Sequence, residues 1–154
     1  MLVLILCSIS VFSGVVFSPW EWYNGEMRKS KKQKIGHITV PKNALVQPHE
    51  FNVATILSWT GEDVEFIPTG HMPTPDIRFR GLEWEIKSPY GSSSRTIENN
   101  MRLALKQSSN IIIDLSRMKL PEDKCLHEVR QQNSLIRGKH RVVVITKTQK
   151  IIEL

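Results

Sequence analysis

The chain has 154 residues, of which 40% are apolar and 23% are charged, as is usual for a globular protein. This length is sufficient for one domain with a single hydrophobic core and a short extension. Cys7 and Cys125 are the only cysteines, which excludes a fold held together by several disulfides. The formal net charge of +6 favours a polyanionic partner, such as a nucleic acid.

The first segment of the sequence, residues 1–23, is hydrophobic. Residues 1–20 contain no charged side chain, and residues 2–17 are mostly apolar. Three interpretations stay open: a membrane segment at the short limit for spanning a bilayer, a secretory signal, or an extension outside the folded domain. Contact with a membrane through residues 1–20 is therefore one of three expectations, and the localisation of the chain stays open.

A basic stretch over residues 24–35 separates this segment from the rest of the chain. It contains Arg28, Lys29, Lys31, Lys32 and Lys34. Like charges at this density repel one another, so we interpret the stretch as a solvated linker, with phosphate contact as the alternative. The folded domain is then expected over residues 36–154.

Hydrophobic periodicity and turn residues predict the elements of this domain. In chain order we expect a short strand at 35–40, a helix at 50–59, a strand ending near 67, a hairpin of strands 77–79 and 82–87, a helix at 97–107, a strand at 110–115, a helix from about 122 to 137, a strand at 141–146 and an edge strand at 151–152. This order predicts an α/β fold with a mixed central sheet flanked by helices.

The hairpin carries the most informative residues. Alternation in its second strand places Trp84 on the core side, while Glu85 and Lys87 point to the opposite face. The hairpin also brings Asp76 close to Glu85. Two carboxylates and an ammonium group suit a site for Mg²⁺-dependent hydrolysis. The alternative is a solvated strand face with cross-strand ion pairs.

The pattern Pro75-Asp76 followed by Glu85-x-Lys87 resembles the PD-(D/E)xK nuclease superfamily. Residues from about 36 to 154 resemble, in addition, the tRNA nuclease domain at the C-terminus of contact-dependent growth inhibition toxins (CdiA). The blocks that carry this resemblance are 49–50, 64–66, 74–76, 81–87, 94–100, 106–108 and 110–115. The resemblance implies a restriction-endonuclease-like core, cleavage of tRNA in a cytoplasm and a cognate immunity protein as a partner.

The resemblance also implies roles for the residues of the hairpin. Asp76 and Glu85 would bind one or two Mg²⁺ ions, with the Ile86 carbonyl as a further oxygen ligand. Lys87 would orient or activate the attacking water. Glu50, in the first turn of the helix at 50–59, would join this site, although a carboxylate there also stabilises the helix end without any catalytic role.

Substrate contacts are expected from the helix after the hairpin and its N-terminus. Ser94 or Thr96 is expected as the N-cap, where backbone N–H groups attract phosphate, and simple capping is the alternative. Asn100 lies on the same helical stripe as Gln107. Lys106 and Gln107 resemble the polar pair that many members of the superfamily carry there, and an exposed polar pair without a function is the alternative.

Two other functions are compatible with the same residues. A DNA endonuclease of this fold would use the same site, because the choice of substrate depends on surface loops and on contacts with the 2′-hydroxyl of RNA. A non-catalytic, basic nucleic-acid-binding module of a mobile element would use the acidic residues only in ion pairs.

Overall fold

A mixed β-sheet is the centre of the computed structural model, which describes residues 34–70 and 74–154. The described residues contribute seven strands, ordered in space as in the sequence. The strands are β1 (Ile38–Thr39), β2 (Val64–Phe66), β3 (Ile77–Phe79), β4 (Leu82–Lys87), β5 (Asn110–Asp114), β6 (Arg141–Ile145) and β7 (Ile151–Glu153). The hydrophobic segment 1–23 and nearly all of the basic linker 24–35 lie outside the described residues.

The sheet is antiparallel where hairpins connect neighbouring strands and parallel where helices do. β2, β3 and β4 form an antiparallel meander, and β6 and β7 are also antiparallel. β4, β5 and β6 are parallel, as are β1 and β2. The helices that connect the parallel strands are α1 (Pro48–Ser58), α2 (Ser94–Ala104) and α3 (Glu122–Leu135). The predicted α/β fold, a mixed sheet flanked by helices, is confirmed.

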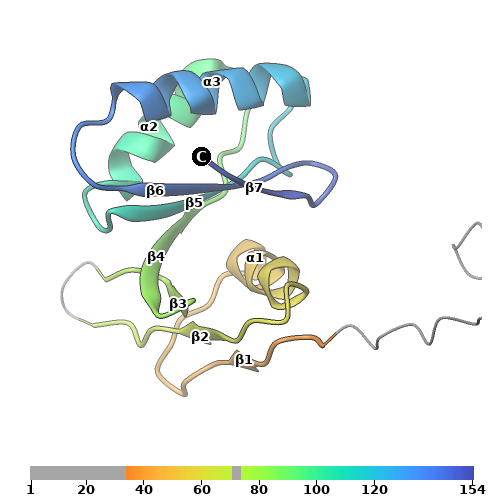
Figure 1. Ribbon diagram of the computed structural model, residues 1–154, viewed down its shortest axis with the longest axis vertical. Coiled ribbons are helices and arrows are strands. Elements are labelled where there is room, and N and C mark those ends of the chain that lie inside the picture. Colours follow the sequence, from red (N-terminus) through yellow and green to blue (C-terminus); the bar gives the residue numbers. More distant parts are fainter. Residues whose placement is uncertain (1–33, 71–73) are drawn as a thin grey trace, which may run out of the picture. The chain divides into compact units, whose positions relative to one another are not determined.

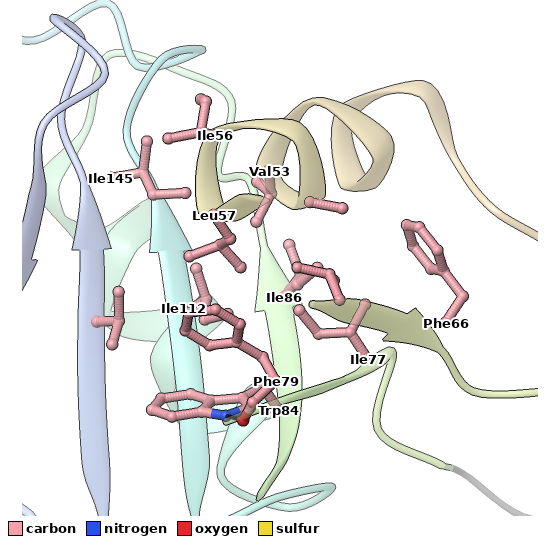
Figure 2. Close-up of a cluster of buried hydrophobic side chains, with 13 residues drawn as sticks. Val53, Ile56, Leu57, Phe66, Ile77, Phe79, Trp84, Ile86, Ile112 and Ile145 are labelled. Atoms are coloured by element: carbon pink, nitrogen blue, oxygen red, sulfur yellow. Dashed lines mark hydrogen bonds between the residues drawn. The ribbon is translucent and has the colours of Figure 1, made fainter. Parts of the chain in front are cut away.

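The helices cover both faces of the sheet. Figure 1 shows α2 and α3 together on one face and α1 on the other. Each face has its own hydrophobic cluster, and β5 contributes to both: Ile112 packs toward α1, whereas Ile111 and Ile113 pack toward α2 and α3. Figure 2 shows the cluster beneath α1, where Trp84 and Ile86 lie among side chains of α1, β2 and β3. The apolar run 111–113 is therefore a strand buried on both faces, as its sequence indicates.

The β3–β4 hairpin has the register that the sequence predicts. Ile77 lies opposite Trp84 and Phe79 opposite Leu82, across a two-residue turn. Arg80 and Gly81 both have positive φ, at 52° and 72°, which matches the twist of the flanking strands. The Trp84 Nε1–H donates a hydrogen bond to the Phe79 carbonyl over 2.9 Å, so the indole also fixes the turn.

Helix boundaries differ from the prediction at several ends. α1 begins at Pro48, two residues earlier than expected, because proline suits the first helical position. α2 begins at Ser94 with Ser93 as the N-cap residue, so the assignment of Ser94 or Thr96 as the N-cap is wrong. Its last turn tightens, since the N–H groups of Lys106 and Gln107 bond three residues back. None of the helices in the described part of the chain is long and apolar enough to span a membrane.

Candidate active site

Asp76 lies immediately before the first residue of β3, which is an interior strand of the sheet. Its N–H donates to the Trp84 carbonyl over 3.0 Å, and its Oδ2 accepts the N–H of Ile86 over 2.6 Å. The carboxylate thus accepts a backbone N–H of β4 at the point where the pairing of β3 with β4 ends. The N–H and C=O of one strand residue point to the same edge, so the Ile86 carbonyl is directed toward the side on which Asp76 lies.

Glu85 points away from the α1 core and is buried on the opposite face, with 1% of its surface exposed. Its Oε1 atom accepts two hydrogen bonds, one from the Lys87 ammonium group and one of 2.7 Å from the Gln107 amide at the end of α2. Its Oε2 atom is buried and has no hydrogen-bond partner among the described residues. A buried carboxylate oxygen without a donor is costly, which is a reason to expect a ligand there.

The alternative of a solvated strand face fits Glu83 but not Glu85. Glu83 is exposed and pairs with Arg78 over 3.3 Å, and Arg78 also pairs with Glu65 over 3.0 Å. These exposed pairs stabilise the protein little. Glu85 lies two residues further along the same face but inside the protein, so one strand carries both a surface ion pair and a buried cluster.

Burial controls the protonation of the two carboxyl groups. Burial raises the pKa of Asp76 to about 7; the hydrogen bond from Ile86 lowers it, and the charges of Glu85 and Glu50 raise it further. Burial also raises the pKa of Glu85, while Lys87 opposes this rise.

A cleft of about 440 Å³ opens beside Asp76. Its lining includes Asp76, Glu50 and Gln107, together with the segment 44–47 and all residues of the segment 66–70 except Pro68. Glu50 accepts the N–H of Gln47 over 2.9 Å, so it stabilises the start of α1 as well as facing the cleft. Among the described residues, no three His, Cys, Asp or Glu side chains form a group that could hold a metal ion. A metal at this site would therefore have two carboxylates, the Ile86 carbonyl and water as ligands, a set that Mg²⁺ accepts.

The structure separates the predicted substrate-binding residues into two groups. Gln107 reaches the site, where it holds Glu85. Asn100 donates to the Thr96 carbonyl over 2.8 Å, a bond within α2. Ser94 and Lys106 are exposed, and nothing in their geometry ties them to the carboxylates.

Sequence reasoning missed a second buried carboxylate near the site. Asp114, 3% exposed at the end of β5, accepts bonds from the Ser88 hydroxyl over 2.9 Å and from the Ser116 hydroxyl over 2.8 Å. It thereby fixes the residue that follows Lys87. The signal that points to it in the sequence is a lone charge directly after the buried run 111–113.

Comparison with known proteins adds two similarities. The family model of the contact-dependent growth inhibition CdiA C-terminal domain matches residues 73–151, about half of the chain. A solved structure, the CdiA-CT/CdiI toxin and immunity complex from Burkholderia pseudomallei, contains a chain of similar fold, with a TM-score of 0.60 and 22% sequence identity. The similarity covers 77% of this chain and 98% of that chain. A comparison with curated proteins gives no match.

Proposed function

The chain belongs to the family of contact-dependent growth inhibition CdiA C-terminal domains, which are toxin domains, and from this premise we propose that it is a metal-dependent nuclease that cleaves tRNA. We also propose that it is a member of the PD-(D/E)xK superfamily with a restriction-endonuclease-like core. The motif Pro75-Asp76 and Glu85-x-Lys87 supports this assignment, as does its position on the hairpin of a mixed sheet.

One observation carries the proposal: the Oε2 atom of Glu85 is buried beside Asp76 without a donor. The other oxygen of Glu85 is already bound to Lys87 and Gln107, and Asp76 Oδ2 is bound to Ile86. These contacts orient the two carboxylates and leave oxygens for a cation. The donor set therefore fits a hard divalent ion, which Asp76, Glu85 and the Ile86 carbonyl would hold.

The chemistry divides among the residues of the site. Bound Mg²⁺, as one ion or two, would supply a Lewis acid for the phosphate and favour ionisation of a water. Lys87 orients the attacking water and offsets negative charge on the scissile phosphate. Its bond to Glu85 holds the ammonium group beside the proposed metal ligands. Gln107 keeps the Glu85 carboxylate in place, and Glu50 lines the cleft beside Asp76.

A cleavage assay tests this function. The purified chain is incubated with total tRNA and with plasmid DNA, each in Mg²⁺ and in EDTA. We expect cleavage of tRNA in Mg²⁺ alone, and a loss of about 100-fold or more for Lys87→Ala, because an electrostatic stabiliser of the transition state is removed. Lys124→Ala is the matched control, since Lys124 is an exposed lysine of α3.

Other results of this assay would identify another function or contradict the proposed site. Cleavage of the plasmid but not of tRNA would identify a DNA endonuclease of the same fold. Binding of nucleic acid without metal-dependent cleavage would identify a non-catalytic binding module. Equal activity of the Lys87 and Lys124 variants would contradict the proposed site while leaving a nuclease elsewhere on the chain.

We further propose that an acidic immunity protein binds the chain. The similar solved structure is a toxin and immunity complex, and the net charge of +6 favours an acidic partner through electrostatic complementarity. Growth of cells that produce the chain should stop, and co-production of the immunity protein should restore it. Toxicity that no small acidic protein from the same genetic locus relieves would contradict this partner.

A further inference from the structure

Tyr90 lies on the surface three residues after Lys87, on the chain segment that leaves β4. Its exposed fraction is 61%, although Ser88 and Pro89 before it are both buried. The bond from Ser88 to Asp114 fixes this segment against β5. The phenol ring is therefore presented to solvent from a fixed backbone, at a distance along the chain of about 10 Å from Lys87.

Two cations lie over the Tyr90 ring. The Arg117 guanidinium carbon is 5.6 Å from the ring centroid and the Lys119 Nζ is 5.2 Å from it. Both side chains are exposed, whereas Met118 between them is buried. A parallel bridge pairs Gly91 with Met118, and the Lys119 N–H donates to the Gly91 carbonyl over 2.7 Å. The backbone thus positions the three side chains before any ligand arrives.

The positive charges of this cluster are not neutralised by the protein. The ion pairs within the described residues involve Arg78, Arg80 and Lys87, and neither Arg117 nor Lys119 takes part in one. Two neighbouring cations repel each other, so their placement beside one ring favours a polyanion. A Cβ at Gly91 would lie 3.4 Å from the Thr96 hydroxyl, so the first turn of α2, which also attracts anions, is adjacent.

We propose that Tyr90, Arg117 and Lys119 form a binding site for an unpaired nucleotide of an RNA strand. The base would stack with the aromatic and guanidinium groups, and the neighbouring phosphates would bind the two cations. This inference rests on the proposed nuclease function, because the strand would continue from the cleft to this site. An acidic protein surface would use only the two cations. A nucleotide would use the cations and the exposed ring, so the cluster suits a nucleotide better.

Binding of labelled single-stranded polyuridylate, measured by fluorescence anisotropy in EDTA, tests the site without cleavage. We expect Tyr90→Ala to weaken binding about 5- to 100-fold, as for the loss of one stacked base, and Tyr90→Phe to bind like the wild type. The double variant Arg117→Gln with Lys119→Gln should lower the slope of log K against log salt by about 1.4, or about 0.7 for each phosphate contact.

Two controls make the result specific. The variant Arg130→Gln with Lys139→Gln removes the same charge from α3 and the loop after it, and should leave the slope unchanged. Labelled poly-glutamate measures attraction of any acidic polymer, and its binding should not change in Tyr90→Ala. Wild-type affinity for RNA in Tyr90→Ala, or an equal loss of poly-glutamate binding, would overturn the nucleotide site.

The same proteins, assayed for tRNA cleavage in Mg²⁺, separate this inference from the proposed function. Binding that depends on Tyr90 without any cleavage supports the nucleotide site and contradicts the nuclease. Cleavage by the wild type together with RNA binding that is indifferent to Tyr90 overturns the nucleotide site and leaves the nuclease intact.

Discussion

At the scale of single residues, burial gives neighbouring carboxylates different chemistry. Glu83 and Glu85 lie on the same face of β4, but Glu83 forms an exposed ion pair, while Glu85 is buried with an oxygen that lacks a partner. Asp76 is bound through one oxygen to the Ile86 N–H, and burial raises its pKa to about 7. The chain therefore keeps a proton at this site near neutral pH unless a cation replaces it.

The raised pKa of Asp76 predicts how stability depends on pH without metal. In the unfolded chain this group titrates near 3.8, so folding takes up a proton between about pH 4 and pH 7. The stability that Asp76 contributes is complete below pH 4 and is lost as the pH rises to 7. Asp76→Asn removes the buried charge, so in EDTA it should raise the melting temperature more at pH 8 than at pH 5. An equal shift at both pH values would contradict the assigned pKa.

The side chains of the candidate site were predictable from the sequence. Which of their carboxylate oxygens accept hydrogen bonds was not. The Pro-Asp pair and the alternation over 82–87 predicted that Asp76, Glu85 and Lys87 lie close together, and their contacts in the structure agree. The alternation could not distinguish Glu83 from Glu85, because their burial depends on where α2 ends. Gln107 was predicted to contact substrate, whereas it is bonded to Glu85, a contact that requires the fold.

At the scale of elements, the β3–β4 hairpin and the end of α2 assemble the site. The register of the hairpin brings Asp76 beside Ile86, and the two-residue turn determines this register. The turn was readable from Arg80-Gly81 between alternating segments. The start of α2 was not readable, because the consecutive serines 92–94 give equal capping signals, and Ser93 is the N-cap residue without a side-chain capping bond.

The turn predicts the cost of a methyl group at Gly81. Its φ of 72° disfavours other residues, although a Cβ there would meet no atom within 4 Å. Gly81→Ala should therefore lower the free energy of unfolding by about 1 kcal/mol through backbone strain alone. Urea denaturation measures this change, with Gly81→Asn as the control, since asparagine tolerates this conformation. An alanine variant as stable as the wild type would show that the turn does not constrain the hairpin.

The contact between Gln107 and Glu85 predicts a positioning role for Gln107. Gln107→Ala should raise the Mg²⁺ concentration required for half-maximal cleavage about 10- to 100-fold, because the oriented carboxylate loses a supporting bond. The KM for tRNA should change little. Lys106→Ala, next to it in sequence, is the comparison. A raised KM with an unchanged Mg²⁺ requirement would assign Gln107 to substrate binding instead, as the sequence suggested.

At the scale of the whole molecule, one sheet with a hydrophobic cluster on each face supports the cleft beside Asp76. The α1 face is packed by one cluster and the α2–α3 face by another. Glu85 is buried on the α2–α3 face, where Lys87 and Gln107 bond to it. The order of elements and the mixed sheet were readable from periodicity and turn residues. The cleft was not, since residues 44–47, 66–67 and 69–70 meet Asp76 only in the folded chain.

Metal binding should stabilise the whole domain. A ligand that binds only the folded state raises the free energy of unfolding by about 2.7 kcal/mol at a concentration of 100 times its Kd. Mg²⁺ should therefore raise the melting temperature, and more at pH 8 than at pH 6, because it competes with the proton on Asp76. A melting temperature that is the same in Mg²⁺ and EDTA at pH 8 would argue against a metal between these carboxylates.

The most direct measurement of the central claim is calorimetric titration of Mg²⁺ into the metal-free chain at pH 8. Asp76 and Glu85 are proposed to hold the ion together, so binding should be measurable for the wild type and lost in Asp76→Asn and in Glu85→Gln. Glu83→Gln changes a carboxylate on the same strand face that is exposed and ion-paired, and it should bind like the wild type. Equal binding by all four proteins, or no binding by the wild type, would contradict the site.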